Sequence, residues 1–271
     1  MKKFIRENKI DAVISDNRFG MYYKKVVSVY ITHQLLIKTG NRFTEKLAQD
    51  LHYFFIKNFN TCWVPDYAEN GLAGDLSHPK NTPRNIRYIG FLSRFEKITG
   101  SKKVREVLII ISGPEPQRTI FEEKIISQLS GINKKVLLVR GLPDEPKILQ
   151  TGNKITAIEN HLSSEEMNMA IQESEVIICR SGYSTIMDLV KLGCAAVIVP
   201  TPGQTEQEYL GEYLMQQKYF YCISQDDFKI REAMGEAAAF QFSQPDFPLD
   251  YYKKALNEFV QSLKSGKFAA Q

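Results

Sequence analysis

The stretch ICRSGYSTIMDLVKLGCAAVIVPTPGQTEQEYLGEYL, residues 178–214, decides how the whole chain is interpreted. An apolar run ends at Cys179 and turns through Arg-Ser-Gly, with Gly182 as its last residue, into a helical pattern that carries Asp188. A second apolar run, AAVIV (195–199), follows that helix. Strand, turn, helix and strand in this order form the repeating unit of parallel α/β sheets.

The rest of the chain continues this alternation. Short β-branched runs predict strands at 11–15, 26–31, 61–64, 104–111, 135–139, 175–179 and 195–199. Helical patterns fall at 44–59, 117–129, 163–174, 184–192, 206–217 and 249–266. Most of the strands are apolar on both faces, which is typical of a parallel sheet covered by helices on each side. The sequence therefore predicts an α/β protein.

The domain organisation follows from a polar, Gly- and Pro-containing stretch from 65 to 83 that separates two groups of elements. We place a boundary near Leu92. The expected parts are an N-terminal domain (1–92), a C-terminal domain (93–248) and a final helix with a tail (249–271).

Composition excludes several classes of protein. With 43% hydrophobic and 24% charged residues the chain is ordinary for a soluble globular protein, and no apolar run is long enough to span a bilayer. The net charge of +4 suits an anionic substrate or a membrane surface but falls short of a nucleic-acid footprint. The four cysteines are far apart and the four histidines are scattered, so we expect reduced core thiols and no metal site.

In open α/β sheets ligands bind beyond the carboxyl ends of the strands. The residues at these positions are polar or glycine. They are Asp16-Asn17-Arg18, Thr32-His33-Gln34, SGPEPQRT (112–119), Arg180-Ser181-Gly182 and TPGQTEQ (201–207). If the strands are parallel, these groups lie along one edge of each sheet.

The Arg-Ser-Gly turn has the clearest chemistry. A helix that starts just after Gly182 presents free backbone N–H groups and a partial positive charge, which suit a phosphate, and the glycine permits close approach. Asp188, about one turn into that helix, can accept hydrogen bonds from two neighbouring ribose hydroxyls. These features describe half of a nucleotide site.

Other interpretations stay open for each of these residues. The turn can be an ordinary strand-to-helix connection with Ser181 as the N-cap, and Asp188 can be a solvated helix residue. His33 can be a structural histidine, and the 112–119 loop, with two prolines, can be only a turn. Gln204 and Gln207 taken alone would be surface residues.

The segment from Glu165 to Leu214 resembles the donor-binding domain of the GT-B glycosyltransferases of family 28, the family of the peptidoglycan N-acetylglucosaminyltransferase MurG. The resemblance lies in a strand ending C-R-S-G, a helix with an acidic residue in its second turn, a strand ending V-P, and a Gln-containing loop before Tyr209. It implies a GT-B-like fold with two Rossmann-like parallel-sheet domains.

The resemblance also implies roles for individual residues. Asp188 takes the place of a Glu that holds the ribose of a uridine nucleotide, and Gln207, with Gln204 nearby, matches the site of the donor sugar. Arg94 matches an arginine that meets the donor phosphates. The segment at Leu162 and Ser163 corresponds to the region that reads the uracil. Ser112 and Gly113 stand in the place of the family's Gly-rich loop. The 112–119 loop of this chain lacks the double glycine and the serine of that family loop.

The first part of the chain resembles the acceptor domain of the same enzymes more faintly, with His33 in a loop that follows a strand. The family's opening G-G-x-G-G-H loop has no counterpart before Asp11. We therefore expect the first domain to be incomplete at its N-terminal side, and Asp16 and His33 are the candidates for a general base.

The resulting hypothesis is an inverting transfer of a hexose or N-acetylhexosamine from a UDP-sugar to a hydroxyl acceptor, without metal or cofactor. The acceptor would be a lipid-linked or cell-envelope glycan precursor, and the location cytoplasmic, at the inner face of the membrane with peripheral contact. Two alternatives remain: a non-catalytic UDP-sugar-binding fragment that acts with a partner chain, and a UDP-sugar hydrolase on the same fold.

Overall fold

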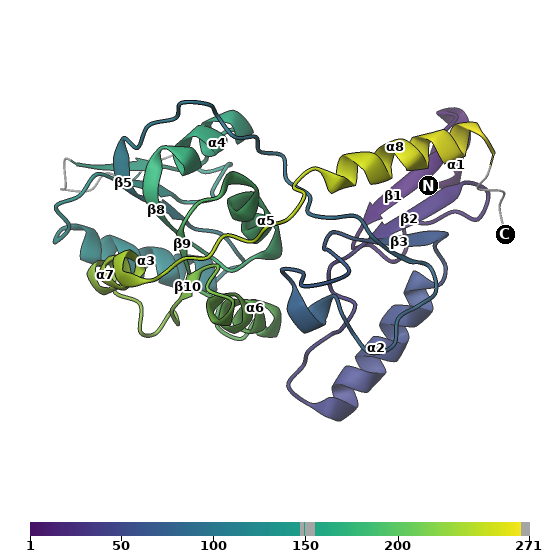
Figure 1. Cartoon of the computed structure of the whole chain (residues 1–271), viewed down its shortest axis with the longest axis horizontal. Helices are drawn as coiled ribbons and strands as arrows, with labels where there is room; N and C mark the ends of the chain where they lie inside the picture. The colour runs from purple at the N-terminus through teal and green to yellow at the C-terminus, as the bar shows by residue number, and fades with distance from the viewer. Residues whose placement is uncertain (147–148, 150–154, 267–271) are drawn as a thin grey trace. The chain divides into compact units, whose positions relative to one another are not determined.

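The computed structural model describes residues 1–146, 149 and 155–266 (Figure 1). It divides into two compact units. The first comprises Met1–Leu92 together with the segment from Phe247 to the C-terminus, and the second comprises Ser93–Asp246. The helix of the 249–271 segment therefore belongs to the same unit as the first 92 residues.

The first unit contains a parallel sheet of four strands in the order β1-β2-β3-β4. The strands are β1 (Ala12–Asp16), β2 (Val27–Ile31), β3 (Thr61–Val64) and β4 (Ile86–Tyr88). The helical elements of this unit are α1 (Lys2–Glu7), α2 (Arg42–Ile56), α8 (Tyr251–Lys264) and the 3-10 helix η1 (Gly74–Leu76). The sequence predicted the first three strands, whereas β4 lies just before the expected boundary.

Helices cover both faces of this sheet, and alternation along the strands determines which side chain meets which helix. Val29 and Trp63 pack against Phe259 of α8. Their sequence neighbours Tyr30 and Cys62 point the other way, into a cluster with Ile56 of α2 and residues near it. This arrangement is why β2 and β3 are apolar on both faces.

The second unit contains a parallel sheet of six strands in the order β10-β9-β8-β5-β6-β7. The strands are β5 (Arg105–Ile110), β6 (Val136–Val139), β7 (Thr156–Glu159), β8 (Ser174–Cys179), β9 (Ala196–Ile198) and β10 (Tyr221–Cys222). Its helices are α3 (Gln117–Leu129), α4 (Ser164–Gln172), α5 (Tyr183–Leu192), α6 (Thr205–Gln216) and α7 (Ile230–Ala239). In chain order within the unit, the strand order reads 3-2-1-4-5-6 from the β7 side, which is the doubly wound dinucleotide-binding pattern. The predicted α/β class with parallel sheets is confirmed.

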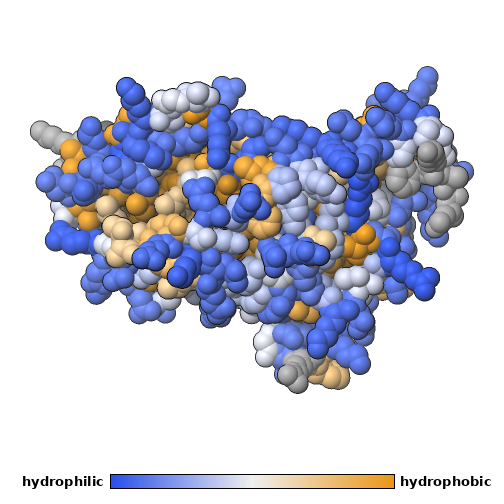
Figure 2. All heavy atoms as spheres, in the orientation of Figure 1, coloured by the Kyte–Doolittle hydropathy of each residue, from blue (hydrophilic) through white to orange (hydrophobic). Residues whose placement is uncertain are grey.

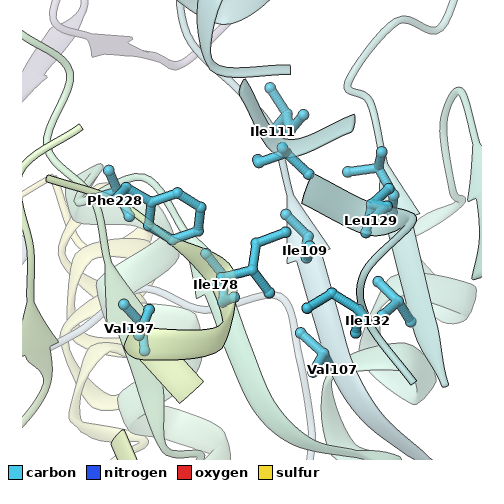
Figure 3. Packing of buried hydrophobic residues seen from close by; sticks show 14 of the residues in the cluster. Val107, Ile109, Ile111, Leu129, Ile132, Ile178, Val197 and Phe228 are labelled. Carbon is cyan, nitrogen blue, oxygen red and sulfur yellow. The ribbon is translucent and has the colours of Figure 1, made fainter. Parts of the chain in front are cut away.

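A large apolar core packs between this sheet and two helices. Side chains that alternate along β5, such as Val107 and Ile109, meet Leu129 at the end of α3, and Phe228 lies just before α7 (Figure 3). On the surface, hydrophilic residues cover most of the face drawn in Figure 2, and hydrophobic ones gather in patches over the second unit. The core fixes where the strands end, and therefore where the polar turns lie.

Candidate nucleotide-sugar site

The switch point of the second sheet lies between β5 and β8, the neighbouring strands whose connections run in opposite directions. The turn after β8 leads directly into α5. The N-cap of α5 is Gly182, and no side chain caps it. A Cβ placed on Gly182 would meet nothing within 4 Å, so packing does not require the glycine there. The first turn of α5 is therefore an uncapped helix N-terminus beside open space.

Ser181 is not the N-cap that an ordinary turn would use. Its side chain is fully buried, and its Oγ donates a hydrogen bond to the carbonyl of Gln207 at 2.9 Å. This bond ties the end of β8 to α6. The role expected of Ser181 at the ligand is thereby changed, because the hydroxyl that would face a phosphate is engaged inside the protein.

Arg180 also points inward. Its side chain is 1% exposed, and its guanidinium donates to the carbonyls of Val199, Pro200 and Gln117 and to the side chain of Gln225. We placed Arg180 among the residues at the ligand-binding edge of the sheet, and such burial does not fit a direct contact between its side chain and a ligand. Arg180 is buried because β9 ends and α3 begins at the same edge of the sheet, and both cover its side chain.

Asp188 lies in the second turn of α5. It accepts a hydrogen bond from a residue at the N-terminal end of the second unit. Ser93 Oγ donates to Asp188 Oδ1 at 2.6 Å, and Arg94, the next residue, is exposed nearby with its guanidinium 5.0 Å from the Phe95 ring centroid. Burial raises the pKa of Asp188, while the Ser93 hydrogen bond and the charge of Arg94 oppose that rise. The structure thus brings the predicted residues Arg94 and Asp188 together.

Ser93 is a site residue that the sequence did not reveal. A serine beside an arginine in a linker carries no pattern of its own, and only the fold shows that it reaches a carboxylate 95 positions along the chain. Its hydrogen bond leaves Asp188 Oδ2 available for another donor.

The loop after β5 differs from a phosphate cradle. Ser112 and Gly113 are exposed, and Gly113 has φ +106°, a backbone conformation that favours glycine. However, Glu115 occupies the N-terminus of α3: its Oε2 accepts from the Thr119 N–H at 3.1 Å and its Oε1 from Arg118 Nε at 2.5 Å. The hydrogen bond from Arg118 holds the pKa of Glu115 below its usual value. A carboxylate already fills the position that a phosphate would take at α3.

Leu162 and Ser163 precede α4. Ser163 is its N-cap and forms a capping box with Glu166: Ser163 Oγ accepts from the Glu166 N–H at 3.2 Å, and the Ser163 N–H donates to Glu166 Oε2 at 2.8 Å. Because the Ser163 N–H is engaged, a base edge at this loop would have to use the backbone of Leu162, which is half-buried.

The two glutamines of the 201–207 loop form a chain of hydrogen bonds. The Thr201 N–H donates to Gln207 Oε1 at 3.0 Å, and Gln207 Nε2 donates to Gln204 Oε1 at 2.5 Å. Since a backbone N–H can only donate, it fixes the orientation of both amides. The amide nitrogen of Gln204 therefore stands at the end of this chain and takes no part in its bonds.

In the first unit, Asp16 is the last residue of β1 and His33 comes two residues after β2. These strands are parallel neighbours, so the two residues lie at the same edge of the sheet, with Asp16 exposed and His33 half-buried. Asp66, which lies two residues after β3, was not identified from the sequence. Its buried carboxylate accepts from Ser77 Oγ and from the N–H groups of Tyr67, Leu72 and Ala73, which makes it a loop anchor.

Neither a metal-binding cluster nor a membrane-spanning helix is found in the described residues. No group of three or more His, Cys, Asp or Glu side chains in 1–146, 149 and 155–266 is arranged to hold a metal ion. Over the same residues, no helix has the length and apolar character needed to cross a bilayer. The arrangement that remains is an uncapped helix N-terminus, a carboxylate and an exposed arginine at one sheet edge, which suits a nucleoside diphosphate.

Comparison with known proteins finds matches over most of the chain. Residues 113–263 match the profile of the glycosyltransferase family 28 C-terminal domain. The UDP-N-acetylglucosamine–N-acetylmuramyl-(pentapeptide) pyrophosphoryl-undecaprenol N-acetylglucosamine transferase of Rickettsia akari is 30% identical over 260 residues, which cover 83% of this chain and 66% of the relative. The chain spans about two thirds or less of the length of the curated relatives it matches.

Two solved structures show the same fold over nearly the whole chain. Acinetobacter baumannii MurG superposes with a TM-score of 0.52 and 13% identity, covering 97% of this chain and 76% of MurG. A putative UDP-N-acetylglucosamine 2-epimerase from Listeria monocytogenes superposes with a TM-score of 0.57 and 11% identity, covering 99% of this chain and 77% of the epimerase. The GT-B fold is thereby confirmed, and because proteins named for different reactions share it, the fold alone does not select the reaction.

Proposed function

The chain belongs to glycosyltransferase family 28, and from that membership we propose that it transfers a hexose or N-acetylhexosamine from a UDP-sugar to a hydroxyl acceptor with inversion. The Rickettsia akari relative is named for transfer of N-acetylglucosamine to a pyrophosphoryl-undecaprenol carrier. We extend that donor and a lipid-linked acceptor to this chain as the specific form of the proposal.

One observation carries the proposal: the uncapped N-terminus of α5 and the carboxylate of Asp188 lie on the same helix at the switch point. The diphosphate would sit at the helix N-terminus, where N–H groups and the helix dipole favour negative charge. The ribose would sit one turn further along, where Asp188 accepts from its hydroxyls. Ser93 holds the carboxylate in place for that contact.

The sugar would meet Gln204 first. Because the hydrogen-bond chain from Thr201 through Gln207 orients its amide nitrogen, Gln204 offers a donor to a sugar oxygen, such as a hydroxyl or an acetamido carbonyl. In this arrangement Gln207 orients Gln204 and does not itself have to touch the sugar.

Transfer would proceed by direct displacement. The acceptor oxygen attacks the anomeric carbon from the face opposite the diphosphate, the bond from that carbon to the diphosphate oxygen breaks, and the acceptor proton passes to a base. The α5 N-terminus and Arg94 would stabilise the charge that develops on the departing UDP, which is where electrostatic preorganisation acts most strongly. Asp16 and His33, at the carboxyl edge of the first sheet, remain our candidates for the base.

Asp188→Ala tests the nucleoside site. Removing the carboxylate leaves the ribose hydroxyls unpaired. We therefore expect the binding free energy of UDP, measured by calorimetry, to become less favourable by about 1 to 3 kcal/mol. Wild type should also bind UDP more tightly than 2′-deoxy-UDP, and the variant should not distinguish the two. Glu236→Ala removes an exposed carboxylate from α7 in the same unit and should change neither affinity. Unchanged UDP affinity in Asp188→Ala would contradict the assignment of Asp188 to the ribose.

Product analysis separates transfer from the two alternatives. With a lipid-linked pyrophosphate acceptor, a transferase forms a glycosylated lipid and releases UDP in equal amounts. Release of free sugar without acceptor would indicate a hydrolase, and UDP-sugar binding without either product would indicate a binding protein.

A lipid-linked acceptor requires contact with a membrane, and the first unit offers a surface suited to it. Phe43, Leu47, Leu51 and Phe54, here called the α2 stripe, are spaced to lie on one face of α2 and are between 56% and 79% exposed. The unit containing them has 18 Lys and Arg against 10 Asp and Glu, a net charge of +8. Exposed apolar side chains on a basic unit suit an anionic lipid surface, which supports a peripheral location at the inner face of the cytoplasmic membrane.

Vesicle flotation tests this surface. Wild type should float with vesicles that contain an anionic phospholipid and less with purely zwitterionic ones, and Leu47→Asp with Phe54→Asp should abolish the difference. Ile120→Asp alters an exposed apolar residue of the second unit and serves as the control. Equal flotation of both variants would remove the α2 stripe from the proposal without affecting the nucleotide site.

A further inference from the structure

Arg180 is unusual among the buried cations of the second unit because it has no carboxylate partner. Arg118 and Arg140 both bond to Glu122, and Lys191 lies 3.4 Å from Glu96. The four groups that accept from Arg180 are neutral, at 2.6 to 3.3 Å, and its guanidinium stacks 4.2 Å from the Phe121 ring centroid. Within the described part of the chain no ion pair to Arg180 occurs, and its Nε has no partner.

A buried charge without a counter-ion is expensive, and proteins usually pair it or neutralise it. Burial does lower the pKa of Arg180, to about 10, but this leaves the guanidinium protonated at neutral pH. The second unit therefore keeps a full positive charge inside the protein with only carbonyl and amide dipoles and one aromatic ring around it.

The location of this charge is informative. The carbonyls that hold it belong to Val199 and Pro200, at the end of β9, and to Gln117, the first residue of α3. Arg180 itself is two residues before Gly182, the N-cap of α5. The charge lies at the carboxyl edge of the sheet, directly behind the turn that opens the uncapped helix, and not at the amino-terminal edge.

We infer that Arg180 supplies an internal positive charge that attracts the donor's diphosphate without touching it. It is a positioning residue whose counter-ion is the ligand: the charge is left unpaired in the protein so that it acts together with the N-terminus of α5. This inference rests on the proposed function, since it takes a uridine diphosphate at α5 as the ligand.

A purely structural role predicts something different. If the four hydrogen bonds of Arg180 only clamp the loops, its loss should weaken the binding of any ligand at this edge, charged or not. If its charge acts on the phosphates, the loss should spare uridine and grow from UMP to UDP. For a phosphate charge about 8 to 10 Å from the guanidinium, and an effective dielectric constant of about 20, the attraction would correspond to roughly tenfold or more in affinity.

The test measures uridine, UMP and UDP affinities by calorimetry in wild type, Arg180→Met and Arg180→Lys. For Arg180→Met, which keeps the length and removes the charge, we expect the ratio of UDP to uridine affinity to fall by about tenfold or more. Arg180→Lys, which keeps the charge, should retain most of the ratio. Arg105→Met is the matched control: it removes a partly buried arginine at the start of β5, the opposite edge of the sheet, and should leave the ratio unchanged.

An Arg180→Met ratio equal to that of wild type, or an equal loss for uridine and UDP, would overturn the inference. If Arg180→Met does not fold, Arg180→Lys alone decides, because loss of the ratio in a variant that still carries the charge contradicts an electrostatic role. Failure of the wild type to bind UDP would instead overturn the proposed function.

Discussion

The two units of this protein handle charge in opposite ways. The first unit has a net charge of +8, yet the only charged side chain among its buried described residues is Asp66, and its buried His52 has no hydrogen-bond partner. The second unit has 17 Lys and Arg against 21 Asp and Glu, a net charge of −4. Among its described residues it nevertheless buries five charged side chains: Arg118, Glu122, Arg140, Arg180 and Lys191.

This difference indicates which kind of anionic partner each unit can bind. Charge spread over a surface acts on other surfaces, and it is screened by salt within about 10 Å. Charge held inside, at the end of a sheet, is screened less and acts on a ligand bound at that place. The buried charge of the second unit thus suits the small anionic ligand proposed for it, whereas the surface charge of the first unit suits the lipid surface proposed as its partner.

The buried ionic cluster of the second unit gives the largest expected effect. Glu122 accepts from both Arg118 and Arg140, and Arg140 Nη1 also donates to Asn160 Oδ1 at 2.8 Å. Glu122→Ala removes the buried carboxylate that these two buried guanidinium groups share, and breaking a buried ion pair of this kind costs about 3 to 5 kcal/mol. Urea unfolding followed by far-UV circular dichroism should show a loss of stability of this size.

The neighbouring Glu123 provides the control, because it is exposed and its replacement by alanine should change stability by no more than about 0.5 kcal/mol. The chain has a single tryptophan, Trp63, buried in the first unit, so its fluorescence reports on that unit. Glu122→Ala should shift the dichroism transition more than the fluorescence transition. Equal behaviour of the two alanine variants would contradict an ionic cluster that stabilises the second unit.

The sequence predicted the second unit well because its signals are local. Each predicted strand there is a short β-branched run, and the helix pattern at 117–129 coincides with α3. The missed elements have weak patterns: β7 is the partly polar TAIE, and β10 has only two residues. α7 was missed as well, and its Gly235 lowers the helix propensity of that stretch.

The candidate site was predicted less completely, because its geometry depends on the orientation of individual side chains. A sequence shows that Arg180, Ser181 and Asp188 follow a strand, but not which way each side chain points. Arg180 and Ser181 turn inward because β9, α3 and α6 converge on the same edge, while Asp188 meets Ser93 across 95 residues of chain. Such contacts depend on tertiary packing and leave no periodic pattern.

The buried histidine of the first unit gives the next largest effect. His52 is 4% exposed, lies 5.3 Å from the Phe19 ring centroid, and has no partner for either nitrogen among the described residues. Burial lowers the pKa of His52 to about 4, from 6.5 in the unfolded chain. Between these two values the unfolded chain binds a proton that the folded protein does not. Stability therefore falls as pH drops from 6.5 to 4, by up to about 3 kcal/mol.

Urea unfolding followed by Trp63 fluorescence at several pH values checks this. His52→Phe should fit the aromatic cluster and flatten the pH dependence by the amount attributed to His52, because no proton can bind there. His161→Phe, at an exposed position of the second unit, should leave the dependence as in wild type. If the pH profiles of wild type and His52→Phe run parallel, the first unit does not owe its acid sensitivity to a neutral buried group, and this part of the comparison fails.

The smallest effect concerns Ser93, which is the first residue of the second unit. Ser93→Ala removes the hydrogen bond to Asp188, so UDP affinity should fall by about 1 kcal/mol, roughly fivefold. The same bond opposes the rise that burial causes in the pKa of Asp188, so its loss raises that pKa further. Because the ribose contact uses the ionised carboxylate, UDP binding by the variant should weaken at a higher pH than in wild type as the solution is acidified.

A double-mutant cycle shows whether Ser93 acts through Asp188. If it does, Ser93→Ala should have almost no effect on UDP affinity in an Asp188→Ala background, since the group that it orients is gone. Ser101→Ala, at an exposed position of the same linker, should be silent in both backgrounds. Additive losses would mean that Ser93 contributes independently of the carboxylate, and the second unit would then hold its ligand through separate contacts and not through a chain of oriented groups.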